Sequence, residues 1–175
     1  MRTDLVFTLT GTDRVGLVEE VTGVLLDVGG NVETSRMARL GGEFAMLVLL
    51  SLPAEQVAAA ESALAHLTEQ GYRVSFAETR PDAAFALEGW RPYRVSVHGA
   101  DHEGIVHEVA RGLSQRGITI ESMETGVSAA AVSGLTLFNM TALVLVPPQV
   151  EATDWVDVLV EAGQQSNVDG EIDPA

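Results

Sequence analysis

Cysteine is absent from this sequence of 175 residues. Its absence excludes disulfide bonds, thiolate nucleophiles and zinc sites with cysteine ligands. Aromatic residues are also scarce, at 5% of the chain, whereas hydrophobic residues make up 46%. We therefore expect a globular protein whose core is built mainly of valine, leucine, isoleucine and alanine. The length allows one ordinary domain or two small ones.

Basic residues are few, with 10 lysines and arginines against 25 acids and a net charge of −15. A surface this negative repels nucleic-acid phosphates, so we expect no direct contact with nucleic acid. The N-terminal stretch MRTDLVFTLT carries an acid where a signal peptide needs its apolar core. The apolar run FAMLVLLSLP is too short to span a bilayer, so we expect a cytoplasmic protein without membrane contact.

The chain contains an internal repeat. The stretch GTDRVGLVEEV at residues 11–21 returns as GADHEGIVHEV at residues 99–109, a separation of 88 positions. FAMLVLLSLP and FNMTALVLVP are 94 positions apart, so the second copy holds six extra residues, which fall near SAAAVSG. Two copies of this length predict two similar domains, at residues 1–80 and 93–175. The proline-containing segment 81–92 is expected to link them.

Each copy predicts the element order β-α-β-β-α-β. In the first copy, alternation predicts a strand at residues 4–10, and apolar residues at helical spacing from Val15 to Val28 predict a helix ended by Gly29. A hairpin at residues 31–52, a helix at 53–71 and a strand at 72–78 follow. The second copy repeats this order, with a helix around 152–165 and a short strand near 168–172. The pattern is α+β and ferredoxin-like, an antiparallel four-stranded sheet with both helices on one face.

The repeated turn is the candidate binding site. Residues 11–16 join a strand to a helix, whose first N–H groups and dipole favour a small anion or carboxylate. Gly16 would let a ligand approach the backbone, while Asp13 or Arg14 would contact its charged groups. The alternative is architectural: Asp13 caps the helix, and Gly16 only allows the helix to pack on a strand.

Other chemistries have weaker support. Leu17 and Val18 stand where a phosphate-binding loop requires lysine and serine or threonine. His102 and His107 raise the alternative of a metal-dependent enzyme, but at five residues apart they do not share a helix face well. His66 is expected on the solvated side of its helix, and the pair Glu19-Glu20 is expected on the solvated surface. We expect no catalytic residues, no metal and no cofactor.

The stretches GTDRVGLVEEVTGVLLDVGGNV and GADHEGIVHEVARGLSQRGITI resemble the ACT domain family. The shared signature is Asp-Arg-x-Gly-Leu-Val, an apolar helix, and Gly-x-Asn-Val or Ile opening the next strand. A tandem pair without a catalytic domain is similar to the glycine cleavage system transcriptional repressor group. The resemblance implies two ferredoxin-like domains that pair side by side or face to face, with amino acids bound at interfaces between such domains.

The resemblance also implies the ligand-binding residues. In the first copy these are Asp13, Arg14, Gly16 and Leu17, with Asn31 meeting the ligand from the adjoining domain; the second copy supplies Asp101, His102, Gly104, Ile105 and Thr119. Thr119 stands where the first copy has Asn31, and Glu103 where it has Val15. These differences leave open an arrangement in which one copy binds ligand and the other serves in pairing.

We therefore expect a non-enzymatic regulatory protein that senses an amino acid such as glycine or serine. We expect it to form a homo-oligomer and to modulate a protein partner, for example a DNA-binding regulator, in transcriptional control of glycine cleavage. The alternative is a structural or assembly module that binds no ligand.

Overall fold

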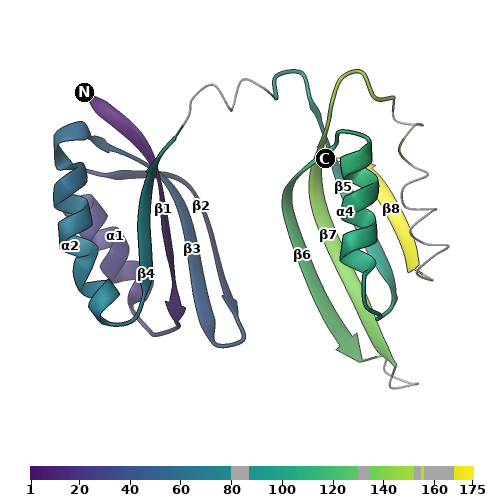
Figure 1. The fold of residues 1–175 in the computed structure, drawn as a ribbon, viewed down its shortest axis with the longest axis horizontal. Coiled ribbons are helices and arrows are strands. Elements are labelled where there is room, and N and C mark those ends of the chain that lie inside the picture. The colour runs from purple at the N-terminus through teal and green to yellow at the C-terminus, as the bar shows by residue number, and fades with distance from the viewer. Residues whose placement is uncertain (80–86, 130–134, 152–154, 156–167) are drawn as a thin grey trace. The chain divides into compact units, whose positions relative to one another are not determined.

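The computed structural model describes residues 1–79, 87–129, 135–151, 155 and 168–175 (Figure 1). The chain divides into two compact units, Met1–Pro81 and Asp82–Ala175. Residues 81–86 of the expected linker lie outside the described residues, as do residues 130–134 in the segment expected to hold the six-residue insertion. The last two residues of the expected linker, Arg91 and Pro92, already belong to a strand.

The first unit contains an antiparallel sheet in the order β2-β3-β1-β4. Its strands are β1 (Arg2–Thr12), β2 (Asn31–Leu40), β3 (Glu43–Pro53) and β4 (Arg73–Glu78). Leu5, Phe7 and Leu9 of β1 are buried, because alternate side chains of a strand point to the same face. The β2–β3 hairpin turns through Gly41 and Gly42, whose φ angles of 60° and 92° are those that a tight hairpin requires.

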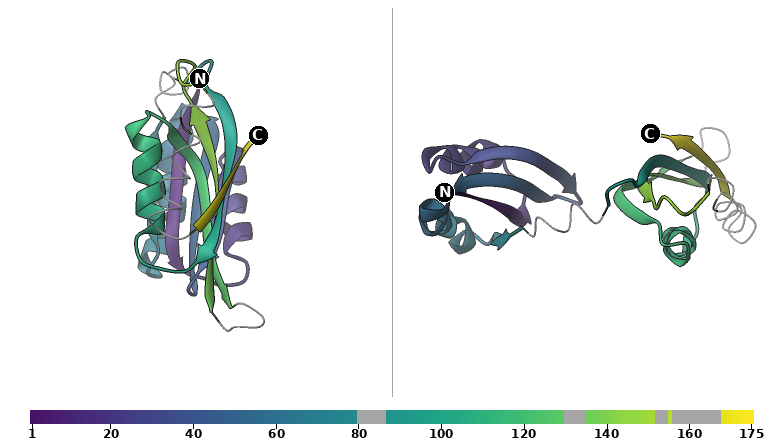
Figure 2. Two further views of the ribbon diagram at one scale, coloured as in Figure 1. Left: turned by 90° about the vertical axis from the view of Figure 1, so that its right-hand side faces the viewer. Right: turned by 90° about the horizontal axis from the view of Figure 1, so that it is seen from above.

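Two helices cover one face of this sheet, as Figures 1 and 2 show: α1 (Leu17–Asp27) and α2 (Val57–Glu69). A short 3₁₀ turn, η1 (Ala54–Gln56), precedes α2. The helix residues buried against the sheet recur three or four positions apart, which places them on one side of each helix. They are Leu17, Val21 and Leu25 from α1, and Ala60, Leu64 and Leu67 from α2.

The sequence predicted the end of α1 correctly but not its start. Gly29, with a φ of 74°, follows the end of the helix as predicted. The expectation that Val15 begins the apolar face of this helix was wrong. Val15 precedes the helix and is fully exposed, because the chain is still turning at this point and first reaches the core at Leu17.

The second unit repeats the arrangement, with an antiparallel sheet in the order β6-β7-β5-β8. Its elements are β5 (Arg91–Ala100), α4 (Ile105–Gln115), β6 (Thr119–Ala129), β7 (Thr136–Val146) and β8 (Val168–Pro174). The helix expected around residues 152–165 lies outside the described residues apart from Trp155. The Trp155 side chain is buried, with its ring 5.2 Å from that of Tyr93. The predicted class, two ferredoxin-like folds in tandem, is confirmed.

The packing of β1 can be tested with two neighbouring residues that face opposite sides of the sheet. Phe7 is 0% exposed and its ring lies 5.0 Å from that of Phe76, so Phe7→Ala should lower the free energy of unfolding by about 3–5 kcal/mol. Val6 is only half-buried, and Val6→Ala should cost about 1 kcal/mol or less. Urea denaturation followed by circular dichroism measures both; equal losses would contradict the assignment of faces.

Candidate functional site

A strand-to-helix elbow has the same backbone conformation in both units. We call residues 11–16 the first elbow and residues 99–104 the second elbow. Gly16 precedes α1 with φ 87° and ψ −4°, and Gly104 precedes α4 with φ 96° and ψ −10°. This left-handed region strains a residue that carries a Cβ atom, so glycine is the natural occupant. A Cβ atom added at either glycine would meet nothing within 4 Å, so both elbows are open on that side.

Backbone amides of the first helical turn stand unpaired beside Gly16. The Glu20 amide donates to the Gly16 carbonyl at 2.9 Å, and the Leu17 amide donates to the Arg14 carbonyl at 3.4 Å. The amides of Val18 and Glu19 have no acceptor among the described residues. Because the helix dipole adds partial positive charge here, these amides can receive a carboxylate.

Asp13 does not cap α1. Gly16 is the N-cap residue of α1 and the helix start has no side-chain capping bond, so the architectural interpretation of this aspartate as a cap was wrong. Its carboxylate instead accepts from the guanidinium of Arg39 on β2, at 2.8 Å, and its amide donates to the Gly42 carbonyl at 3.1 Å. Asp13 therefore ties the first elbow to the β2–β3 hairpin and leaves the helix start uncapped.

Arg14 is held between α1 and the corner that leads into β4. Its guanidinium forms an ion pair with Glu20 and lies 5.8 Å from the centre of the Tyr72 ring. The Tyr72 hydroxyl donates to the Thr12 carbonyl at 2.9 Å, and the ring lies against Gly11, where a Cβ atom would overlap it. Tyr72 thus supports both the strand end and the arginine of the first elbow.

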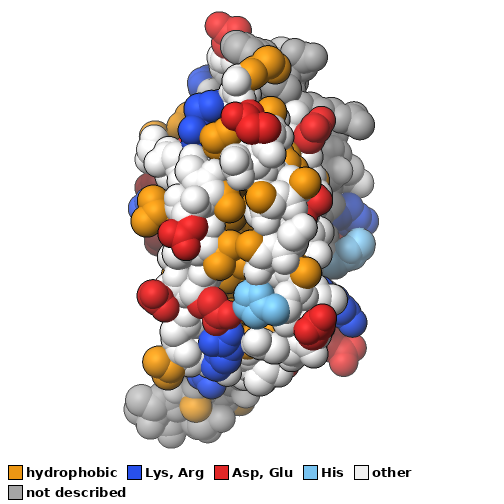
Figure 3. Space-filling view, turned by 90° about the vertical axis from the view of Figure 1, so that its left-hand side faces the viewer, with side chains coloured by type: hydrophobic (Ala, Val, Ile, Leu, Met, Phe, Trp, Pro, Cys, Tyr) orange, Lys and Arg blue, Asp and Glu red, His pale blue; other side chains and the backbone are white. Residues whose placement is uncertain are grey.

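Glu20 also pairs with a histidine from the second helix. His66 on α2 approaches Glu20 at 2.7 Å through Nε2, while its Nδ1 lies 2.8 Å from the Ala63 carbonyl. His66 and Glu20 therefore lie at the surface, as expected, with 40% and 29% of their side chains exposed, but the contact between them was not predicted. On the face that carries α1 and α2, Figure 3 shows a histidine beside acidic and basic side chains, next to hydrophobic ones.

This contact shifts the pKa values of both groups. The hydrogen bond with Glu20, and then that with the Ala63 carbonyl, raises the pKa of His66. The bonds from Arg14 and then His66 lower the pKa of Glu20. The contribution of His66 to stability is therefore lost as pH rises through its raised pKa, and that of Glu20 as pH falls through its lowered pKa. The contact between Glu20 and His66 therefore stabilises the fold most at mildly acidic pH, above the lowered pKa of Glu20 and below the raised pKa of His66.

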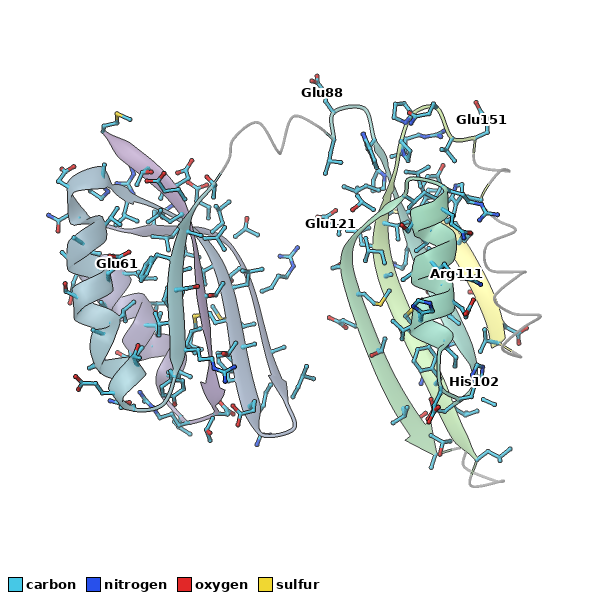
Figure 4. All side chains as sticks on the ribbon, viewed as in Figure 1. Glu61, Glu88, His102, Arg111, Glu121 and Glu151 are labelled. Atoms are coloured by element: carbon cyan, nitrogen blue, oxygen red, sulfur yellow. The ribbon has the colours of Figure 1, made fainter. Side chains whose placement is uncertain are left out.

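The second elbow has a different chemical character. Gly104, Ile105 and Phe138 line an open hollow of about 430 Å³ together with His102, Val106, His107 and Ala110. His102 lies at the start of α4 in Figure 4, and its Nδ1 is 2.9 Å from the Glu103 carbonyl. Glu108 pairs with Arg111 on its own helix, whereas the corresponding Glu20 reaches across to α2. The backbone geometry is repeated, but the ion pairs that the described residues form are not the same.

Asn31 and Thr119 lie away from the elbows of their own units. Asn31 begins β2 opposite Ser51, at the end of the sheet remote from Thr12 and Gly16. It lines an open hollow of about 410 Å³ with Glu19, Thr22, Gly23, Leu25, Leu26, Gly30 and Val32. Thr119 begins β6 opposite Leu145 in the same manner. Within a single unit, the predicted elbow residues therefore lie in one short segment. The predicted residue that begins the strand after the helix, Asn31 or Thr119, lies apart from them.

Two of the predicted residues can contribute only through the backbone. Leu17 and Ile105 are almost fully buried, with their side chains in the two hydrophobic cores. Within the described ranges, no three potential ligands are placed to hold a metal ion. Over the same residues, no helix is long and apolar enough to cross a membrane.

Comparison with known proteins supports the interpretation of the fold. Residues 3–77 match the family model of the ACT domain. Glycine cleavage system transcriptional repressors of Escherichia coli K12 and Shigella flexneri are each 47% identical to this chain over 47 residues. That stretch is 27% of this chain and 25% of each repressor, so the chain matches only a quarter of the length of these relatives.

Two solved structures match almost end to end. An unknown protein from Galdieria sulphuraria is 34% identical, with a TM-score of 0.83 and coverage of 100% of this chain and 99% of that chain. A protein provisionally described as a glycine cleavage system transcriptional repressor is 24% identical, with a TM-score of 0.69 and coverage of 99% and 97%. At that lower identity, the second likeness concerns the fold alone.

The left-handed elbow can be tested by adding one methyl group at each of two glycines of the first unit. Gly16→Ala should lower the free energy of unfolding by about 1 kcal/mol, because alanine is strained at a φ of 87°. Gly23 lies within α1 with open space around it, so Gly23→Ala should raise stability by about 0.5–1 kcal/mol. Chemical denaturation measures the two changes; the same sign for both would contradict the assigned elbow conformation.

Proposed function

Since residues 3–77 match the ACT domain family and the second unit repeats their fold, we propose that this chain is a non-enzymatic regulatory protein that binds an amino acid. The ligand binds at the first elbow, and its binding modulates a protein partner. The observation that carries this proposal is the pair of unpaired amides at Val18 and Glu19, beside an open glycine and a cation.

Each part of a small amino acid has a matching group at the first elbow. The amides of Val18 and Glu19 donate to the carboxylate, with the α1 dipole favouring its charge. Gly16 leaves room beside the backbone, and Arg14 adds positive charge. An Asn31 side chain from an adjoining ACT domain also contacts the ligand, since its amide can both donate and accept hydrogen bonds.

Glycine and serine are the first ligands to consider. Proteins similar to this chain over 47 residues are named as repressors of the glycine cleavage system, and this name supports both a regulatory role and an amino-acid signal. The net charge of −15 favours a protein partner over direct contact with DNA, because DNA would be repelled. We therefore propose that the chain acts on transcription through a DNA-binding protein.

Self-association is a second role that one observation favours. β2 is an edge strand, and all of its residues except Ser35 are exposed. Val32 on β2 and Leu26 on α1 are exposed apolar residues in the same hollow as Asn31. An exposed strand edge beside apolar side chains favours pairing with another chain, so we expect a homo-oligomer. An assembly module without a ligand is the alternative function on this basis.

Ligand binding at the first elbow can be tested with two variants that differ in charge but hardly in shape. Asparagine and aspartate both tolerate the left-handed conformation of Gly16. Gly16→Asp places a carboxylate beside the proposed ligand carboxylate, and should weaken glycine or serine binding by about tenfold or more relative to Gly16→Asn. Calorimetric titration with each amino acid, at concentrations up to millimolar, measures the difference.

Two outcomes would contradict the proposal. Equal affinities for the aspartate and asparagine variants would place any binding away from the first elbow. No heat from the wild-type chain with any common amino acid, together with an oligomer detected by light scattering, would favour the assembly module instead.

A further inference from the structure

The arrangement of three charged side chains points to a control on the first elbow that depends on protonation. We propose that His66 is a positioning residue that determines, through Glu20, how firmly Arg14 is held against α1. The proposal rests on the function proposed above, because Arg14 is one of the groups assigned to the ligand.

Glu20 is the shared partner of two cations. Its Oε2 receives the Arg14 guanidinium, and its Oε1 faces Nε2 of His66 at 2.7 Å. These groups come from three separate places in the chain: the elbow, α1 and α2. A displacement or a change of charge at any one of them therefore alters the attraction on the other two.

The surroundings of His66 favour the imidazolium form. Its Nε2 faces the Glu20 carboxylate and its Nδ1 faces the Ala63 carbonyl, so both ring nitrogens face acceptors. Only the protonated ring can donate to both, since the neutral ring carries a single N–H. Arg14 is the other charged group that acts on this ring, and it opposes protonation, whereas Glu20 favours it; the pKa of His66 is raised on balance.

Protonation of His66 changes the hold on Arg14 in a definite direction. When His66 is charged, the single negative charge of Glu20 is divided between two cations, and the cations repel each other. When His66 is neutral, Glu20 attracts Arg14 alone. Falling pH therefore loosens Arg14 from α1 and frees it for a ligand carboxylate. By linkage, a bound ligand that draws Arg14 away from Glu20 makes His66 easier to protonate.

Among the residues that the structure describes, the second elbow shows no such arrangement. His102 occupies the position of Arg14, and Glu108 is paired with Arg111 three residues later on α4. The pH dependence is therefore expected at the first elbow, and a histidine of the second unit supplies a matched control. His98, whose Nδ1 lies 3.0 Å from the Asn139 amide oxygen on β7, serves this purpose.

The experiment measures the mobility of the Arg14 side chain directly, by NMR relaxation of its Nε–H group between pH 5.5 and 8.5. The full-length wild type, His66→Gln and His98→Gln are compared without ligand. Arg14 should become more mobile as pH falls in the wild type and in His98→Gln, and should not respond in His66→Gln. A flat profile in the wild type, or an unchanged profile in His66→Gln, would overturn the proposal.

A second measurement separates this inference from the proposed function. Glycine and serine affinities of the same three proteins are measured over the same pH range, and should rise by about twofold to fivefold toward low pH unless His66 is replaced. A complete lack of binding would refute the proposed function while the mobility of Arg14 still decides the inference. Binding with no pH dependence in the wild type would support the function and refute the control by His66.

Discussion

A left-handed backbone at one residue, Gly16 in the first unit and Gly104 in the second, determines where each first strand becomes a helix. The conformation turns the chain sharply enough for the next residue, Leu17 or Ile105, to enter the core at once. It also leaves the first amides of the helix without a side-chain cap. The same backbone feature thus joins sheet to helix and presents the groups that the proposed ligand requires.

The two copies retain this backbone while their side chains have diverged. In the first copy Tyr72 supports the strand end, contacts Arg14 and lies against Gly11; in the second copy the small apolar Val168 lies opposite Gly99. A guanidinium above an aromatic ring gives the first elbow a positioned cation. The second elbow instead opens onto a hollow lined mainly by apolar side chains. On equivalent backbones, the first elbow therefore carries a positioned guanidinium, whereas the second opens onto a mainly apolar hollow.

The sequence was most informative where one residue type satisfies a local requirement. The two glycines of the β2–β3 turn, the glycine after α1 and the alternation along β1 predicted those elements correctly, because each depends on neighbouring residues alone. The network of Arg14, Glu20 and His66 was missed, because it depends on how α1 and α2 pack together. Two neighbouring acids and a histidine in an alanine-rich helix are ordinary surface patterns, and nothing in them indicates a partner 46 positions away.

The distribution of aromatic residues gives the twin folds different optical properties. Both tryptophans of the chain, Trp90 and Trp155, belong to the second unit, and Trp155 is enclosed in its core beside Tyr93. The first unit has no indole chromophore. Intrinsic fluorescence therefore follows one copy selectively, whereas backbone ellipticity follows both, and the molecule carries its own spectroscopic label for distinguishing its two halves.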